Sequence, residues 1–293
     1  IRRSKGSVSA MRRSLLFIPA NNPGMLQSSD VFNADSIVFD LEDAVFVRDK
    51  DAARTLLREY LKSIKDTQSE IIVRINDEKT PFHSADLGLL RTGRIDTIML
   101  PKATAASFYA FSERLERFEE EHSLSRKVSV IPIIESALGL IEAHEIASHE
   151  RVSGLFLGAE DLATDLMAER TKAGYEILYA RSRLVISARA FGIDAIDTPF
   201  TDTRDEQGLI DDTRSAKSLG MNAKAAIHPD QVHVINRIHS PSRIEIEFAQ
   251  KVLAKHEQLA KGSFSIDGKM IDRPIIERAK RTLASARRWG MIE

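Results

Sequence analysis

The segment Val128-Ser-Val-Ile-Pro-Ile-Ile134 is an apolar run that stops at Glu135, and Gly154-Leu-Phe-Leu-Gly158 is a second run that stops at Ala159-Glu160-Asp161. Residues 138–148 between them have the spacing of a helix. If the two runs are parallel neighbouring strands, the acids that follow them lie side by side at one edge of the sheet. Such carboxylates suit a hard divalent cation, but acids after a strand also cap the helices that follow. The spacing alone does not choose between the two interpretations.

The same alternation of strand and helix extends along most of the chain. Short apolar strands are predicted at residues 14–19, 36–43, 70–76, 95–102, 128–134, 154–158, 193–199 and 223–229. Helices are predicted at residues 49–65, 105–121, 138–148, 174–191, 203–219 and 230–238. Alternation of this kind indicates parallel strands with right-handed crossovers, and eight units fit a closed (β/α)8 TIM barrel. A doubly wound open sheet is the alternative. It is disfavoured because the first strand–helix turn lacks a G-x-G-x-x-G motif and no Walker A sequence occurs.

Three segments of different character divide the chain. Residues 1–12 are basic and aperiodic, which predicts a solvated arm, and residues 13–240 carry the barrel pattern of a catalytic domain. Residues 241–293 form a C-terminal helical extension, with helices predicted at residues 243–259 and 274–287. We interpret the extension as an addition to the barrel rather than an independent domain, because roughly fifty residues bury little core by themselves.

Composition excludes several classes of protein. The chain has 293 residues, 43% of them hydrophobic, and 42 Lys and Arg residues against 43 Asp and Glu residues give a formal net charge of -1. This balance gives no reason to expect nucleic acid or an anionic membrane as a partner. Without cysteine, thiol nucleophiles, disulfides and thiolate metal sites are excluded. No run is apolar enough to span a bilayer and no signal-peptide core is found, so we expect a cytoplasmic protein. The numbering begins at Ile1, which leaves the true N-terminus open.

Polar residues follow the predicted strands where a barrel has its active site, at the carboxyl ends. These residues are Pro19, Asp40 with Glu42 and Asp43, Arg74, Lys102, Glu135, Glu160 with Asp161, Asp197 with Thr198, and His228. A rim with many acids, an arginine and a lysine suits a metal ion and an anionic substrate, although a structural ring of ion pairs gives the same pattern. We interpret His228 as a packing or capping residue. A zinc site and a nucleophile elbow are disfavoured, since no second histidine stands at ligand spacing and no G-x-S-x-G occurs.

Seven motifs in this order are characteristic of a known family. They are Arg13-Ser-Leu-Leu-Phe-Ile-Pro19, Phe39-Asp-Leu-Glu-Asp-Ala-Val45, Val73-Arg-Ile-Asn76, Ile134-Glu-Ser-Ala-Leu-Gly139, Leu157-Gly-Ala-Glu-Asp-Leu162, Ile227-His-Pro-Asp-Gln231 and Asp267-Gly-Lys-Met-Ile-Asp-Arg-Pro274. With them the chain resembles the citrate lyase β-subunit-like family, which includes malyl-CoA and citramalyl-CoA lyases. The resemblance covers residues 12–284. It is specific for the family and much less specific for the substrate.

The resemblance implies a (β/α)8 barrel, a homotrimer or hexamer, and a Mg²⁺-dependent carbon–carbon lyase acting on CoA thioesters. The family's metal ligands correspond to Glu135 and Asp161, and its substrate arginine corresponds to Arg74. The backbone N–H groups of Gly158 and Ala159 resemble its cradle for a keto-acid carboxylate.

Two further residues are assigned by the resemblance. Arg13 corresponds to an additional anion contact, toward the CoA end of the substrate. Asp272 corresponds to the catalytic carboxylate, carried by an extension that covers the barrel mouth of a neighbouring subunit. The residues alone favour an N-cap role for Asp272, because it precedes Pro274.

The resemblance also sets the candidate reactions. We favour a retro-Claisen cleavage of (S)-citramalyl-CoA to acetyl-CoA and pyruvate. A second candidate is the β subunit of a citrate lyase, which cleaves citryl-acyl-carrier protein to oxaloacetate. Malyl-CoA lyase or malate synthase activity is a third, and a non-catalytic acyl-CoA-binding barrel is a fourth. The sequence does not determine which 2-oxo acid is released, whether the thioester carrier is free CoA or a protein, or the physiological direction.

Overall fold

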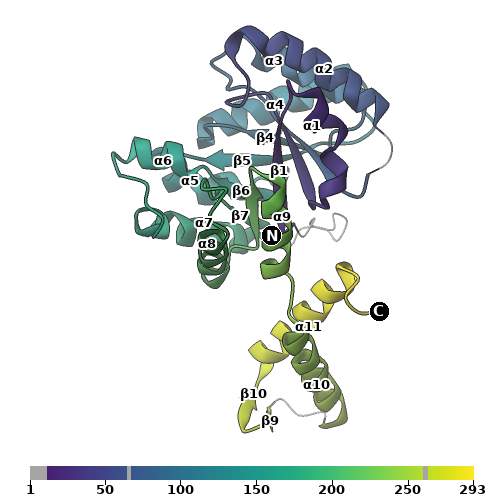
Figure 1. Ribbon diagram of the computed structural model, residues 1–293, viewed down its shortest axis with the longest axis vertical. Helices are drawn as coiled ribbons and strands as arrows, with labels where there is room; N and C mark the ends of the chain where they lie inside the picture. Colours follow the sequence, from purple (N-terminus) through teal and green to yellow (C-terminus); the bar gives the residue numbers. More distant parts are fainter. Residues whose placement is uncertain (1–11, 65–66, 260–262) are drawn as a thin grey trace. The chain divides into compact units, whose positions relative to one another are not determined.

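The computed structural model describes residues 12–64, 67–259 and 263–293 (Figure 1). The chain divides into two compact units between Asn236 and Arg237. The predicted basic arm lies outside the described residues except for Arg12, for which the expectation of a solvated side chain is wrong. Arg12 is buried, and its guanidinium donates hydrogen bonds to the carboxylates of Glu70 and Asp194. Arg12 therefore belongs to the first unit rather than to a free arm.

Eight parallel strands form a closed barrel in the first unit. The strands are β1 (Ser14–Pro19), β2 (Ser36–Asp40), β3 (Glu70–Arg74), β4 (Thr97–Leu100), β5 (Ser129–Ile134), β6 (Gly154–Leu157), β7 (Asp194–Asp197) and β8 (Ala223–Ala226). Each strand pairs with the next one in sequence, and β8 pairs with β1. The predicted (β/α)8 barrel is thus confirmed. The predicted strands run a few residues past the observed ends, because the polar residues after each strand turn into loops.

Helices connect the strands on the outside of the barrel (Figure 1). They are α1 (Pro23–Gln27), α2 (Lys50–Ser63), α3 (His83–Asp86), α4 (Ala105–Glu121), α5 (Ala137–Ala147), α6 (Ala159–Asp165), α7 (Leu178–Phe191), α8 (Glu206–Leu219) and α9 (Pro229–His239). The sequence patterns did not predict α3 and α6, which have four and seven residues and are too short to show a helical repeat. They placed the start of α8 three residues early, because the Asp205 side chain caps this helix by accepting a hydrogen bond from Gly208 N.

The barrel interior is filled by side chains that alternate along the strands. Inward-facing residues of the strands form this core, among them Leu15, Val38, Ile72, Met99, Ile131, Phe156 and Ile196. Because successive side chains of a strand point to opposite faces, the neighbours of these residues face the helical layer. Closure of the barrel also brings the carboxyl ends of all eight strands to one rim.

The second unit contains α10 (Arg243–Leu259), β9 (Phe264–Ile266), β10 (Lys269–Ile271) and α11 (Arg273–Arg288). It has a hydrophobic core of its own, formed by side chains such as Ile246, Val252, Ile271 and Leu283. We expected the extension to bury little core by itself, and the hairpin β9–β10 adds buried residues to those of the two helices. The hairpin turns at Asp267-Gly268, where both residues have positive φ.

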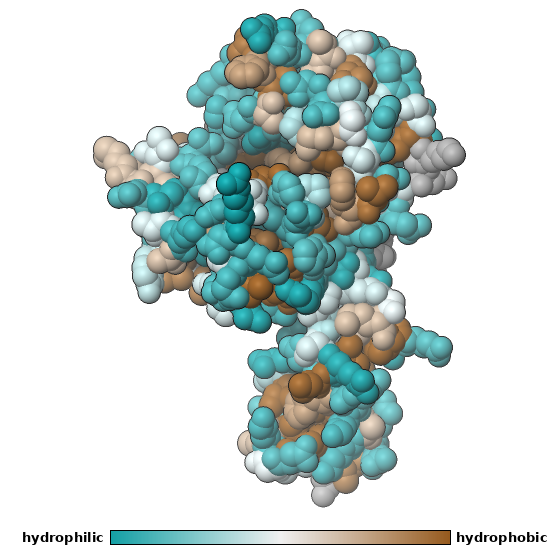
Figure 2. Space-filling model, viewed as in Figure 1, coloured by the Kyte–Doolittle hydropathy of each residue, from teal (hydrophilic) through white to brown (hydrophobic). Residues whose placement is uncertain are grey.

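The surface of the barrel unit is mostly hydrophilic in Figure 2, and a recess with hydrophobic walls opens on the visible face. Within the described part of the chain, no helix combines the length and the apolar character that crossing a membrane requires.

Candidate functional site

A pocket of about 180 Å³ opens at the carboxyl ends of the barrel strands. Its walls are formed by Phe17, Asp43, Arg74, Ile133, Glu135, Phe156, Gly158, Ala159, Glu160, Asp161, Thr198, Pro199 and Ile227. The pocket thus brings together five of the residues that the sequence analysis assigned to the site, from β3, β5 and the β6–α6 junction. Apolar side chains form one part of the wall, and acids with one arginine form the other.

Glu135 follows β5 and is almost fully buried at the base of the pocket. Its Oε1 atom accepts a hydrogen bond of 2.5 Å from the backbone N–H of Lys102. Lys102 has φ of 52°, in the left-handed region that costs energy for a residue with a side chain. Burial is the main reason that the pKa of Glu135 rises to about 7, and the nearby charge of Asp161 raises it as well. The carboxylate is therefore held in place while its negative charge lacks full compensation.

Gly158 leaves the space that the Glu135 carboxylate occupies. A Cβ atom on Gly158 would lie 2.6 Å from both Cβ and Oε2 of Glu135, which is too close for any side chain. The N–H group of Gly158 donates to the carbonyl oxygen of Ile134 in the sheet. This N–H therefore already has an acceptor within the sheet, and its role in a carboxylate cradle stays a prediction. The other N–H of the predicted pair, that of Ala159, donates a long hydrogen bond of 3.4 Å to Thr198 Oγ1.

Asp161 and Glu160 lie in the first turn of α6 but have different surroundings. Glu160 forms an ion pair with Arg170 at 3.0 Å. No donor or cation contacts the Asp161 carboxylate within the part of the chain that the structure describes, although Asp161 lies close enough to raise the pKa of Glu135. The unpaired acid beside the buried one is therefore Asp161, which is the residue that the sequence analysis chose.

Glu135 and Asp161 fit a hard cation that keeps most of its ligands outside the protein. Among the described residues, no group of three or more His, Asp or Glu side chains is arranged to hold a metal ion. Mg²⁺ is commonly held by one or two carboxylates, with water or substrate oxygens completing an octahedron. Two oxygen donors whose mutual repulsion raises a pKa match this requirement, since a cation between them would relieve that repulsion.

Arg74 at the end of β3 is fixed by acids that follow β2. Its Nε and Nη2 atoms donate to the two carboxylate oxygens of Asp40 at 2.7 and 2.6 Å, and Nη1 lies 3.1 Å from Glu42 Oε2. The guanidinium also stacks over the ring of Phe17 at 5.4 Å. These acids raise the pKa of Arg74 above its ordinary value, against the effect of burial, so the group stays charged. Sequence reasoning placed Asp40 and Glu42 at the rim but did not assign them this role.

Glu42 is itself unusual. Burial raises its pKa to about 8 despite the neighbouring Arg74, whose charge is shared with Asp40. At neutral pH this carboxyl group therefore carries a proton in a large share of molecules, within contact distance of the arginine that lines the pocket. The motif Phe39-Asp-Leu-Glu-Asp showed the acids but gave no sign of which one would be buried.

Three other candidate residues have partners within their own unit. Arg13 precedes β1, at the opposite end of the barrel from the rim, and its guanidinium pairs with Asp35 at 2.8 Å. Its contact with the CoA end of the substrate stays a prediction. His228 Nδ1 accepts a hydrogen bond from the N–H of Asp230, as expected for a capping residue. Asp272 belongs to the second unit and caps α11 by accepting a hydrogen bond from Ile275 N.

The raised pKa of Glu135 predicts how stability changes with pH. The folded-state pKa of about 7 exceeds the ordinary value of 4.5, so the group's favourable contribution is complete below pH 4.5 and is lost as the pH rises through 7. In a buffer that contains a metal chelator, Glu135→Gln should therefore be about as stable as the parent chain at pH 4 and more stable at pH 8, by on the order of 3 kcal/mol at most. Urea unfolding at both pH values measures the difference. Glu160→Gln, in the exposed acid, is the control. A gain that is equal at both pH values would contradict the prediction.

Comparison with known proteins places this site in a family. A family model described as HpcH/HpaI aldolase/citrate lyase matches residues 13–229. Citrate lyase subunit beta of Leuconostoc mesenteroides subsp. cremoris is 41% identical over 291 residues, which cover 97% of this chain and 96% of that protein. The mitochondrial citramalyl-CoA lyase of Homo sapiens is 32% identical over 290 residues, covering 94% of this chain and 85% of that protein.

A solved structure supports the same conclusion. The CitE protein of Mycobacterium tuberculosis in complex with magnesium, acetoacetate and coenzyme A has a TM-score of 0.78 and 32% identity, covering 95% of this chain and 99% of that one. The relatives are lyases by name, which confirms the predicted enzyme class, a carbon–carbon lyase. From the family model and these relatives, the chain belongs to the HpcH/HpaI aldolase/citrate lyase family.

Proposed function

We propose that the rim pocket cleaves a 3-hydroxyacyl thioester by a retro-Claisen step, with Mg²⁺ held by Glu135 and Asp161. The observation that carries this proposal is the buried, partly uncompensated carboxylate of Glu135 beside the unpaired Asp161. It agrees with the magnesium and coenzyme A named for the similar CitE structure. A bound Mg²⁺ would polarise the hydroxyl and carboxylate oxygens of the substrate and lower the pKa of that hydroxyl.

The residues of the pocket have separate tasks in this reaction. As the carbon–carbon bond breaks, the hydroxyl group releases its proton to solvent, its carbon becomes a ketone, and the acetyl thioester leaves as an enolate. Arg74, fixed by Asp40, supplies a permanent positive charge for the thioester oxygen, where negative charge develops. The apolar side chains of Phe17 and Phe156 keep the reacting atoms away from bulk water, which strengthens these electrostatic interactions.

The enolate carbon must then receive a proton from a general acid. We assign this role to Asp272 of a neighbouring subunit in a homotrimer or hexamer, as the family resemblance implies. Exposed apolar side chains on the barrel unit, such as Met167, Tyr175 and Ile141, are consistent with an assembly. Glu42 is the competing candidate, because its raised pKa leaves it protonated near neutral pH.

The lining of the pocket favours (S)-citramalyl-CoA, which yields pyruvate. A citramalyl group has one free carboxylate and a methyl group, whereas a citryl group has two free carboxylates. Arg74 is the one basic residue in the described pocket wall, and Phe17, Phe156 and Ile227 offer apolar surface that suits a methyl group. The higher identity to a citrate lyase subunit beta favours the second candidate, cleavage of citryl on an acyl-carrier protein.

A substrate screen of the purified chain tests this choice. With Mg²⁺ and without partner proteins, citramalyl-CoA should release acetyl-CoA and pyruvate with a higher kcat/KM than citryl-CoA or malyl-CoA. Turnover of citryl-carrier protein alone would reject a stand-alone citramalyl-CoA lyase and support a citrate lyase β subunit. If the chain binds these thioesters but cleaves none of them, the result would support the fourth candidate, a non-catalytic acyl-CoA-binding barrel.

The metal assignment is tested by single substitutions. Asp161→Ala and Glu135→Ala should each abolish Mg²⁺-dependent turnover, because one remaining carboxylate holds Mg²⁺ poorly. Circular dichroism should show an intact fold. Glu160→Ala is the matched control, in the same helical turn, and should keep most of the activity and the Mg²⁺ dependence. Normal activity in Asp161→Ala would remove this residue from the metal site.

The general acid is tested by mixing inactive variants. General acid catalysis is typically worth ~10²–10⁴ in rate, so Asp272→Asn should lose about that factor in kcat. If the site is shared, mixing and reassembling Asp272→Asn and Arg74→Ala subunits should restore about one quarter of the sites by random assortment. Glu42→Gln is assayed in parallel. Loss of activity in Glu42→Gln together with a fully active Asp272→Asn would assign the proton transfer to Glu42 instead.

A further inference from the structure

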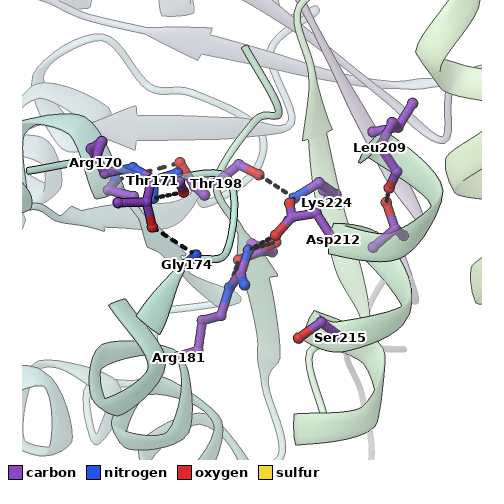
Figure 3. A network of polar contacts seen from close by, with 12 residues as sticks. Arg170, Thr171, Gly174, Arg181, Thr198, Leu209, Asp212, Ser215 and Lys224 are labelled. Carbon is purple, nitrogen blue, oxygen red and sulfur yellow. Dashed lines mark hydrogen bonds and ion pairs between the residues drawn. The ribbon is translucent and has the colours of Figure 1, made fainter. Parts of the chain in front are cut away.

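Four charged side chains form a closed network between β7, β8, α7 and α8 (Figure 3). The ammonium of Lys224 donates to Asp197 Oδ2 at 2.5 Å and to Asp212 Oδ2 at 2.6 Å. Arg181 donates to both carboxylate oxygens of Asp197 and, at 2.6 Å, to Asp212 Oδ1. We call Arg181, Asp197, Asp212 and Lys224 the quartet. Its charges sum to zero, and Asp197 and Lys224 are completely buried.

The quartet is connected to the rim pocket through Thr198. The third proton of the Lys224 ammonium is donated to the backbone carbonyl oxygen of Thr198 at 2.8 Å (Figure 3). Thr198 directly follows Asp197 at the end of β7, so the quartet holds this residue from two sides. Thr198 is also one of the residues that line the rim pocket.

The hydroxyl group of Thr198 accepts one hydrogen bond, and its own proton is available for another. Its Oγ1 atom accepts from the N–H of Ala159 at 3.4 Å, and no acceptor for its own proton is found among the described residues. Thr198 is 1% exposed, and buried hydroxyl protons normally have an acceptor. Any anion that takes the Ala159 N–H also comes within reach of this hydroxyl. A ligand in the pocket that carries an acceptor would satisfy this hydroxyl group.

We propose that Thr198 donates a hydrogen bond to the carboxylate of the 2-oxo acid portion of the substrate, and that the quartet positions Thr198 for this contact. Thr198 thereby adds a donor to the cradle, in which the N–H of Gly158 already bonds to Ile134. The inference rests on the proposed function, because it assumes that a 2-oxo acid or its precursor enters the rim pocket.

A positioning role explains why the quartet is charged. Buried ion pairs are expensive to desolvate, and well-packed apolar residues of similar size are often as stable or more stable. An apolar replacement would not hold the carbonyl of Thr198, because the bond from Lys224 requires a donor. The β7–β8 ladder is also short, with two paired positions, so strand pairing alone fixes the end of β7 weakly.

Substitutions of Thr198 test the substrate contact. Thr198→Val keeps the shape and removes the hydroxyl, and it should lower kcat/KM about 10- to 100-fold, the value of one hydrogen bond to a charged group. The loss should appear mainly in KM, since the carboxylate is bound equally in the ground and transition states. Thr198→Ser should restore most of it. Thr213→Val is the matched control, because Thr213 is a buried threonine whose hydroxyl donates to Leu209 O in α8.

A neutral double variant tests the quartet. Lys224→Met with Asp212→Asn removes one charge of each sign and keeps the Arg181–Asp197 pair, so folding should be retained, as measured by circular dichroism. KM should rise in the direction seen for Thr198→Val, with kcat kept within a few fold. If KM and kcat of the folded double variant equal those of the parent chain, the quartet has no positioning role.

Calorimetric binding of pyruvate in the presence of Mg²⁺ separates the two proposals, because it needs no thioester cleavage. Weaker pyruvate binding by Thr198→Val, with rescue by Thr198→Ser, supports the contact even if no thioester is cleaved, in which case the proposed function fails alone. If the parent chain cleaves a thioester and Thr198→Val keeps the parent KM and pyruvate affinity, the contact with Thr198 is overturned and the proposed function stands.

Discussion

The burial of one carboxylate, that of Glu135, sets the arrangement of the rim. A carboxylate removed from water needs hydrogen-bond donors, and two neighbouring segments accommodate it. The backbone of Lys102 adopts a left-handed conformation and donates its N–H to the carboxylate. Gly158 has no side chain, which leaves room for the carboxylate. These contacts still leave the pKa raised, so the folded protein stores an unfavourable electrostatic interaction at this point. A bound cation would release it, which links metal binding to the stability of the barrel.

Two acids and an arginine at the rim differ in how firmly neighbouring groups hold their side chains. Arg74 is held by both oxygens of Asp40, and Glu135 is held by backbone atoms from another strand. Asp161 has no such partner among the described residues and lies on a short helix at the surface. The pocket thus combines two firmly held charged groups with one carboxylate that is free to adjust its position.

The sequence predicted the barrel because strands buried on both faces leave an unmistakable series of apolar runs, each ended by polar residues. It placed Glu135, Asp161 and Arg74 at the rim for the same reason, since the carboxyl ends of parallel strands coincide. It could not show that the N–H of Gly158 is consumed by the sheet, because that depends on register between β5 and β6. The position of Arg13 at the amino end of the barrel could be read from the predicted strand at residues 14–19 and was overlooked. The hairpin at Asp267-Gly268 was readable from its turn residues and was overlooked.

The quartet has a consequence for the conditions under which the barrel stays closed. Its charges are out of reach of dissolved ions, so added salt should weaken surface ion pairs such as Arg243–Glu247 long before it affects the seam between β7 and β8. The desolvation penalty of buried charges also falls as temperature rises. The side-chain interactions at this seam, which has only two backbone pairs, therefore improve on warming, while hydrophobic contacts level off. In relatives of this barrel, changes that raise thermal stability are expected at the seam between β7 and β8.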